Sequence, residues 1–177
     1  MRIIAGKLGG RIFESPGGHR THPMSDKVRG GLFNALGDVT GLTVLDAFAG
    51  SGALSFEAVS RGAKHCIAIE ADRRAYQSIV KNIDALELKA QIQAVNAYCA
   101  SWSGRHQRET FDILLMDPPY DNLQINDMEK LVRHLKPDGI MVVSWPGKLD
   151  RVELTALEVV SSKNYGDAQL VFYRPIG

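Results

Sequence analysis

Residues 111–120, FDILLMDPPY, decide the fold class of this 177-residue chain. The first half of this stretch is a continuous apolar run, which two prolines bring to an end. Such a run is typical of a strand that is buried on both faces of a parallel sheet. Asp117 then lies at the carboxyl end of the strand, where open α/β sheets bind their ligands.

The turn after this strand carries the groups that an aromatic amine needs. Pro118 and Pro119 have a fixed φ and no N–H, so the turn is stiff and its carbonyl oxygens lack local donors. The Asp117 carboxylate and the Pro118 carbonyl can accept both N–H groups of an exocyclic amine on a nucleobase. Tyr120 can stack on the base. A solvated aspartate before an ordinary Pro-Pro turn explains the same four residues equally well.

Composition indicates one soluble globular domain, because 45% of the residues are hydrophobic and 23% are charged. No apolar run approaches the length of a membrane span, so we expect no membrane association. The two cysteines, Cys66 and Cys99, lie far apart and lack the spacing of metal ligands. We therefore expect a cytoplasmic protein with reduced thiols and no bound metal.

Charge is distributed unevenly along the chain. The first 31 residues contain six basic and two acidic side chains, whereas the rest of the chain contains 15 basic and 18 acidic ones. A basic segment on a mildly acidic body is a candidate phosphate-binding surface, although four excess charges are also compatible with an ordinary surface. The candidate RNA contacts in this segment are Arg2, Lys7, Arg11, Arg20 and Arg29.

The basic segment also has a predicted structure of its own. Residues 2–6 and 11–15 have the pattern of two short strands, and the Lys-Leu-Gly-Gly turn between them favours a hairpin. Ser25 or Asp26 can cap a helix that continues to about Leu36. We expect residues 1–37 to form an arm over the substrate site and residues 38–177 to form the main domain.

Residues 42–54 predict a strand, a glycine-containing turn and the start of a helix. The strand ends near Asp46, and the helix extends from about Gly52 to residue 61. Gly50 and Gly52 permit close approach of a ligand to the backbone and to the helix N-terminus. A dinucleotide-binding fingerprint would have a further glycine at position 55, where this chain has Ser55. The pattern therefore disfavours NAD and is compatible with a smaller adenosyl ligand.

The next predicted strand, residues 65–70, ends in Glu70, which can accept both ribose hydroxyls of an adenosine. The same carboxylate can instead complement the dipole of the helix predicted over 72–86. Asn96 ends a strand over 91–96 and can either bind the adenine amino group or cap the following turn. Further along, the patterns predict a loop over 101–110, a helix over 127–135, and strands over 140–145, 157–162 and 169–173. This alternation implies a mostly parallel sheet.

Taken together, these motifs resemble class I methyltransferases that use S-adenosyl-L-methionine and modify exocyclic amines. The chain is similar to the RsmD family of bacterial 16S ribosomal RNA guanine-N2 methyltransferases in blocks at residues 1–7, 25–29, 32–34, 60–63, 165–167 and 170–174. The resemblance spans nearly the whole chain. It departs from the family pattern at His22 and Gly30, which puts RNA contacts in question and leaves methyl transfer unaffected.

The resemblance implies a Rossmann-like α/β fold, with a seven-stranded mostly parallel sheet, flanking helices and an N-terminal hairpin and helix extension. It implies a monomer that methylates guanine 966 of 16S rRNA within the 30S subunit or an assembly intermediate. Asp117, Pro118 and Tyr120 would hold the target base. The implied cofactor contacts are Asp46, Phe48, Gly50, Gly52, Glu70, Asn96 and Ala97. An adenine-N6 methyltransferase and a non-catalytic cofactor- and RNA-binding module remain alternatives.

Overall fold

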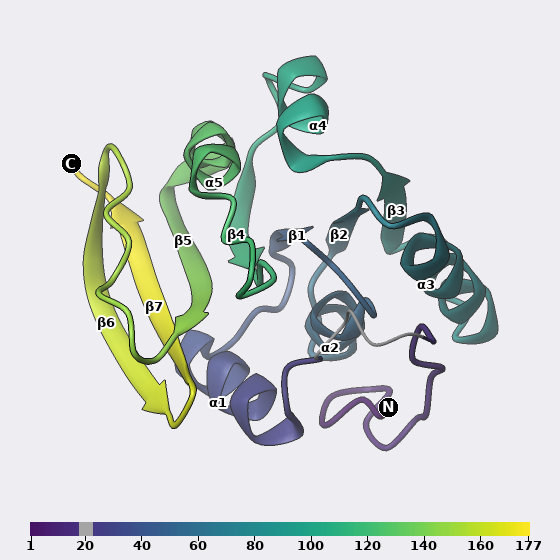
Figure 1. Ribbon diagram of the computed structural model, residues 1–177. Helices are drawn as coiled ribbons and strands as arrows, with labels where there is room; N and C mark the ends of the chain where they lie inside the picture. Colours follow the sequence, from purple (N-terminus) through teal and green to yellow (C-terminus); the bar gives the residue numbers. More distant parts are fainter. Residues whose placement is uncertain (18–22) are drawn as a thin grey trace.

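The computed structural model describes residues 1–17 and 23–177 and contains a central seven-stranded sheet (Figure 1). The strand order is β3-β2-β1-β4-β5-β7-β6, and β7 runs antiparallel to the other six strands. This arrangement confirms the predicted fold class. The strands are β1 (Thr43–Ala47), β2 (His65–Glu70), β3 (Ile92–Asn96), β4 (Phe111–Met116), β5 (Leu135–Pro146), β6 (Leu157–Tyr165) and β7 (Ala168–Pro175).

Helices cover both faces of the sheet (Figure 1). Side chains of α1, α2 and α3 belong to one hydrophobic cluster, and side chains of α4 and α5 belong to the other. The sheet is therefore the middle layer of three. The helices are α1 (Asp26–Leu36), α2 (Ala53–Ser60), α3 (Arg73–Ala85), α4 (Cys99–Arg105), α5 (Ile125–Leu131) and the short 3-10 helix η1 (Val132–His134).

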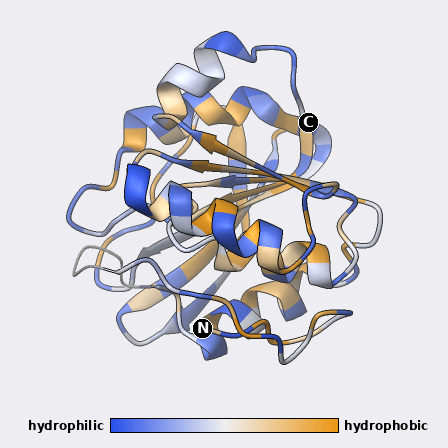
Figure 2. Cartoon of the chain, turned by 90° about the vertical axis from the view of Figure 1, so that its right-hand side faces the viewer, coloured by the Kyte–Doolittle hydropathy of each residue, from blue (hydrophilic) through white to orange (hydrophobic). Residues whose placement is uncertain are grey.

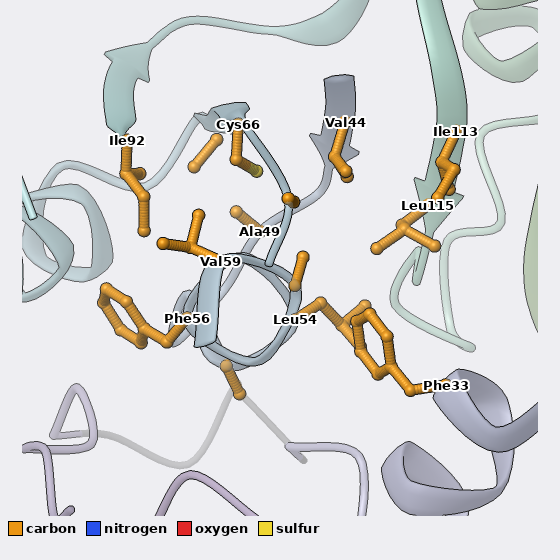
Figure 3. Close-up of a cluster of buried hydrophobic side chains, with 14 of the residues drawn as sticks. Phe33, Val44, Ala49, Leu54, Phe56, Val59, Cys66, Ile92, Ile113 and Leu115 are labelled. Carbon is orange, nitrogen blue, oxygen red and sulfur yellow. The ribbon is translucent and has the colours of Figure 1, made fainter. Parts of the chain in front are cut away.

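Strand β4 is buried on both faces, as its apolar run predicts. It lies between β1 and β5, and alternate side chains enter opposite clusters: Ile113 and Leu115 on one side, Leu114 and Met116 on the other. Figure 3 shows Ile113 and Leu115 on the side of the sheet that faces α2. A strand in this position has its amide groups hydrogen-bonded on both edges, which fixes the place of Asp117 at its end.

Two helices begin with a side-chain cap, and the one at Ser25 was predicted. Ser25 Oγ accepts a hydrogen bond from Val28 N at 3.2 Å, and Asp72 Oδ1 accepts one from Ala75 N at 2.8 Å. By contrast, the prediction of a loop over 101–110 is wrong for residues 101–105, which belong to α4. Its serines and glycine have weak helix propensity, so burial of Cys99 and Trp102 stabilises the helix instead.

The N-terminal segment pairs with itself more weakly than a hairpin of two strands. Its described residues form a single antiparallel bridge, between Arg2 and Ile12, with Ile3 N donating to Arg11 O at 2.9 Å. The segment is held mainly by α2. Glu57 accepts hydrogen bonds from the backbone N–H groups of residues 4 and 5 at 2.8 and 3.1 Å.

Hydropathy follows the layers, since the strands are largely apolar and the outer faces of the helices largely polar (Figure 2). Among the described residues, none of the helices combines the length and the apolar character that crossing a membrane would require.

Candidate active site

The carboxyl ends of four parallel strands bring the predicted site residues to one rim. The register pairs Ala47 of β1 with Met116 of β4, so Asp46 and Asp117 belong to neighbouring strand ends. On the other side, Glu70 of β2 is paired with Asn96 of β3. Strand register thus gathers four polar residues that lie far apart in the sequence.

The loop after β1 has an unusual backbone. Phe48, Gly50 and Gly52 have φ values of 62°, 54° and 79°, in the left-handed region that side chains with a Cβ rarely adopt. A Cβ at Gly50 would have only one neighbour within 4 Å, the Phe48 carbonyl oxygen at 3.9 Å. The loop is therefore open at Gly50, where a ligand can approach the backbone. Phe48 is a strained non-glycine residue in that loop, a feature that is common at functional sites.

Asp46 is fully buried, and Ser55 holds one of its two carboxylate oxygens. Ser55 donates to Asp46 Oδ2 from its backbone N at 3.1 Å and from its hydroxyl at 2.6 Å. The other oxygen, Oδ1, has no hydrogen-bond partner. The pKa of Asp46 is raised to about 7: burial is the largest cause, Ser55 opposes it, and the charges of Asp117 and Glu70 contribute to the rise.

Ser55 is a site residue that the sequence motifs did not identify. In the sequence it stands out only as the residue that breaks a dinucleotide-binding fingerprint, although its place in the first turn of α2 lets it reach back to the end of β1. A hydroxyl at this position, following a strand that ends in an acid, is the signal that could have identified it.

Glu70 is the acceptor for two backbone N–H groups. Gly50 N donates to Glu70 Oε2 and Asp72 N donates to Oε1, each at 2.7 Å. Burial is the main cause that raises the pKa of Glu70. The carboxylate therefore fixes the glycine loop and the start of α3 relative to β2, and its remaining lone pairs are the ones available to ribose.

Asn96 links the ends of two strands. Its amide nitrogen donates to the carbonyl oxygens of Glu70 and Ala71 at 2.9 and 3.0 Å, so its N–H groups are already engaged. Beside it lies a hollow of about 270 Å³. The hollow is lined by Ala71, Asn96, Ala97, Tyr98, Ser101 and Arg105.

Asp117 is partly buried and lies beside Ser144 of β5. The pKa of Asp117 is raised to about 6, because the effect of burial exceeds the opposing effect of the Ser144 hydroxyl. Tyr120 is 40% exposed. Its hydroxyl lies 2.9 Å from Ser144 Oγ and donates to Trp145 O at 3.1 Å. The Tyr120 side chain is thus partly exposed, while its hydroxyl end is anchored to β5.

The predicted RNA contacts divide into exposed and buried residues. Arg2, Lys7 and Arg11 are exposed, and Arg2 forms an ion pair with Asp26 at 2.9 Å. Arg20, like His22, lies outside the described residues.

Arg29 differs from the expectation, because its side chain is 0% exposed. Its guanidinium donates to Arg2 O at 2.7 Å and to Asp26 Oδ1 at 3.0 Å, and its Nε lies 3.7 Å from buried Glu57. A buried guanidinium with these partners holds the N-terminal segment against α1 and α2. We therefore assign Arg29 a structural role and leave it out of the RNA surface.

The rim has the features that a cationic nucleoside requires. Asp46 lies in the field of both Glu70 and Asp117, so a positive ligand would relieve their mutual repulsion. The orphaned Asp46 Oδ1 and the open loop at Gly50 are an acceptor and a space that such a ligand can use. In the part of the chain that the structure describes, no group of three or more His, Cys, Asp or Glu residues is arranged to hold a metal ion.

Comparison with known proteins identifies the family. The model of a family described as conserved hypothetical protein 95 matches residues 1–174. The chain is 33% identical, over the full length of both proteins, to "Putative rRNA methyltransferase YlbH" of Bacillus subtilis. It is 33% identical to "Ribosomal RNA small subunit methyltransferase D" of Haemophilus influenzae, over 81% of this chain and 77% of that protein.

A solved structure leads to the same conclusion. "Putative methyltransferase yhhF from Escherichia coli" superimposes with a TM-score of 0.86 at 28% identity, over 99% of this chain and 97% of that one. The match includes the N-terminal segment as well as the sheet, because almost the whole chain is covered. The chain therefore belongs to this family, the RsmD family of ribosomal RNA methyltransferases.

Proposed function

We propose that this protein transfers a methyl group from S-adenosyl-L-methionine to the exocyclic N2 amine of a guanine in 16S rRNA. The observation that carries the proposal is the position of Asp117. Its partly exposed carboxylate ends β4, two stiff prolines follow it, and the β1 end that leads into the glycine loop is its direct neighbour. Two acceptors for an amine thus lie beside the predicted methyl-donor site.

The cofactor would be held by the residues at the ends of β1, β2 and β3. Gly50 leaves the backbone accessible, and Gly52 lies at the N-cap of α2. Asp46 offers its free Oδ1, and Glu70 offers lone pairs to ribose hydroxyls. Phe48, Asn96 and Ala97 complete the proposed set. When bound, the cofactor supplies an electrophilic methyl group on a sulfonium cation. The acidic rim favours that positive charge.

The target amine would be held by Asp117 and Pro118. The Asp117 carboxylate and the Pro118 carbonyl accept its two N–H groups, which leaves the nitrogen lone pair free for attack. The raised pKa of about 6 still leaves Asp117 mostly ionised at neutral pH. After transfer, the carboxylate can hold the proton that the nitrogen loses. Tyr120 packs on the flipped base, so positioning and electrostatic preorganisation provide most of the acceleration.

The exposed cations of the N-terminal segment support an RNA substrate. Arg2, Lys7 and Arg11 are exposed on a segment whose backbone is hydrogen-bonded to Glu57 and Ser60, in the C-terminal half of α2. We propose that residues 1–37 contact the rRNA backbone and that residues 38–177 carry out methyl transfer. The 30S subunit or an assembly intermediate is the proposed substrate particle, and a monomer is the proposed active form.

The test is transfer of a radiolabelled methyl group to 16S rRNA that lacks this modification, as naked RNA and in 30S particles. Digestion to nucleosides identifies the product. We expect label in N2-methylguanosine. Label in N6-methyladenosine would replace the proposal with an adenine methyltransferase. Cofactor binding without methyl transfer to either form of the RNA would replace the proposal with a non-catalytic cofactor- and RNA-binding module.

A further inference from the structure

Ser144 is a buried polar residue to which the sequence motifs assign no role. It is 4% exposed and follows Val143, which is paired in register with Met116 of β4. Asp117 follows Met116 in the same way. Parallel strands in register direct matched side chains to the same face, so Ser144 is the neighbour of Asp117 across the two strand ends.

Ser144 also contacts the aromatic residue of the site. Its Oγ lies 2.9 Å from the Tyr120 hydroxyl, and the same hydroxyl has a second acceptor, Trp145 O, at 3.1 Å. The Ser144 hydroxyl additionally lowers the pKa of Asp117. A single hydroxyl therefore interacts with both side chains that are proposed to hold the base.

The hydrogen bonds of Ser144 and Tyr120 depend on each other, because each hydroxyl has only one proton to donate. Ser144 has one hydroxyl proton and Tyr120 has one. If Tyr120 donates to Trp145 O, Ser144 can donate to Tyr120, and Asp117 then receives no proton from it. If Ser144 donates to an ionised Asp117, its oxygen is free to accept from Tyr120. The direction of the Ser144 hydroxyl is thus linked to the charge of Asp117.

We propose that Ser144 is a positioning residue for methyl transfer: its hydroxyl joins the Asp117 carboxylate to the Tyr120 phenol and fixes the two relative to each other. The proposal rests on the proposed function, because it assigns Asp117 to the amine and Tyr120 to the base. An ionised carboxylate that accepts from Ser144 is held in one orientation. The ring of Tyr120 is held at the same distance from it.

Two variants separate this role from a merely structural one. Ser144→Ala and Tyr120→Phe both remove the hydrogen bond between the two side chains. Only Ser144→Ala also removes the hydroxyl that lowers the pKa of Asp117. The carboxyl groups of ¹³C-labelled aspartate are titrated by NMR in each protein, and thermal unfolding confirms that each is folded.

We expect Ser144→Ala to raise the pKa of Asp117 by about one pH unit, because the variant has no hydroxyl to donate to the charged form. Tyr120→Phe should leave that pKa at or below the wild-type value. In Ser144→Ala, the acid limb of the plot of kcat against pH should shift to higher pH by the same amount as the Asp117 pKa. The Kd of the cofactor should be unchanged. Ser144→Thr, which keeps the hydroxyl, should restore the wild-type limb.

An Asp117 titration that is the same in folded Ser144→Ala and in wild type would overturn the proposal, as would equal shifts in Ser144→Ala and Tyr120→Phe. Should Ser144→Ala not fold, Ser144→Cys provides the same comparison, because a thiol is a weak donor. The titration requires no methyl transfer. A wild-type protein that transfers no methyl group would therefore refute the proposed function while the Ser144 measurement still stands.

Discussion

Replacing Asp46 with asparagine should change how stability depends on pH in the absence of cofactor. The carboxyl group is fully buried, and its pKa is raised from 3.8 to about 7. Between these two pKa values, the carboxyl group therefore keeps its proton in the folded protein and has lost it in the unfolded chain. Because the folded pKa is the higher one, the stabilisation is fully present below the unfolded pKa and is lost as pH rises through the folded pKa.

The size of the expected stability change follows from the interval between the unfolded and folded pKa values of Asp46. Each pH unit over which the two states differ by one proton corresponds to about 1.4 kcal/mol, so the interval amounts to about 4 kcal/mol. Asparagine has nearly the shape of a protonated aspartate and does not titrate. The two proteins should have similar stability near pH ~4, and the variant should be the more stable one by several kcal/mol near pH ~8.

The assay is urea unfolding followed by circular dichroism at a series of pH values, with the free energy of unfolding compared between the two proteins. The difference cancels the other carboxylates, which are common to both. Ser55→Ala is the matched control, because it removes a donor that favours the ionised form and should shift the transition to higher pH. A difference between variant and wild type that is independent of pH would refute the reasoning.

Four further changes test the other parts of the molecule. Asp117→Ala should abolish methyl transfer while the cofactor Kd, measured by calorimetry, stays close to wild type; an equal loss of cofactor binding would contradict the division of roles. Replacing Lys7 and Arg11 with glutamine should weaken RNA binding and lower the salt slope by about 1 for each phosphate that the variant no longer neutralises, and an unchanged slope would remove both from the RNA surface. Arg29→Ala should instead lower the stability of the protein by about 2 kcal/mol, because it removes the buried guanidinium that donates to Arg2 O and Asp26 Oδ1, while Glu57 keeps its ion pair with Arg61 at 2.8 Å; denaturant unfolding measures this. Burial lowers the pKa of His134, so its contribution to stability should be present above pH ~6.5 and be lost as pH falls through the lower folded pKa; His134→Gln should flatten that acid limb of unfolding free energy, and a limb of wild-type steepness would assign it to other groups.

Much of the fold was predictable because its signals are local. The apolar run of β4 and the two prolines after it are visible in ten residues, and so is the placement of Asp117. The caps at Ser25 and Asp72 are equally local, since each side chain binds an N–H three residues ahead. The helix α4 was not predictable in this way, because its stability comes from contacts of Trp102 with distant parts of the core.

The site shows the same division. The excess of basic residues in the N-terminal segment placed Arg29 among the predicted RNA contacts. The sequence does not reveal that the Arg29 side chain is buried next to an acidic residue of another helix. Glu57 lies in α2, and only the packed structure brings it within 3.7 Å of Arg29 Nε.

The amino-acid sequence by itself determined the alternation of strands and helices, the glycine loop and the strand-end acids at positions 46, 70 and 117. These depend on hydrophobic period and on turn residues, which act over a few neighbours. Only the tertiary structure decided that Ser55 holds Asp46, that Ser144 contacts Tyr120, and that Ser144 follows the strand position paired with the end of β4. The physical reason is that a hydroxyl acquires its partner from strand register and burial, and neither is encoded in the residues next to it.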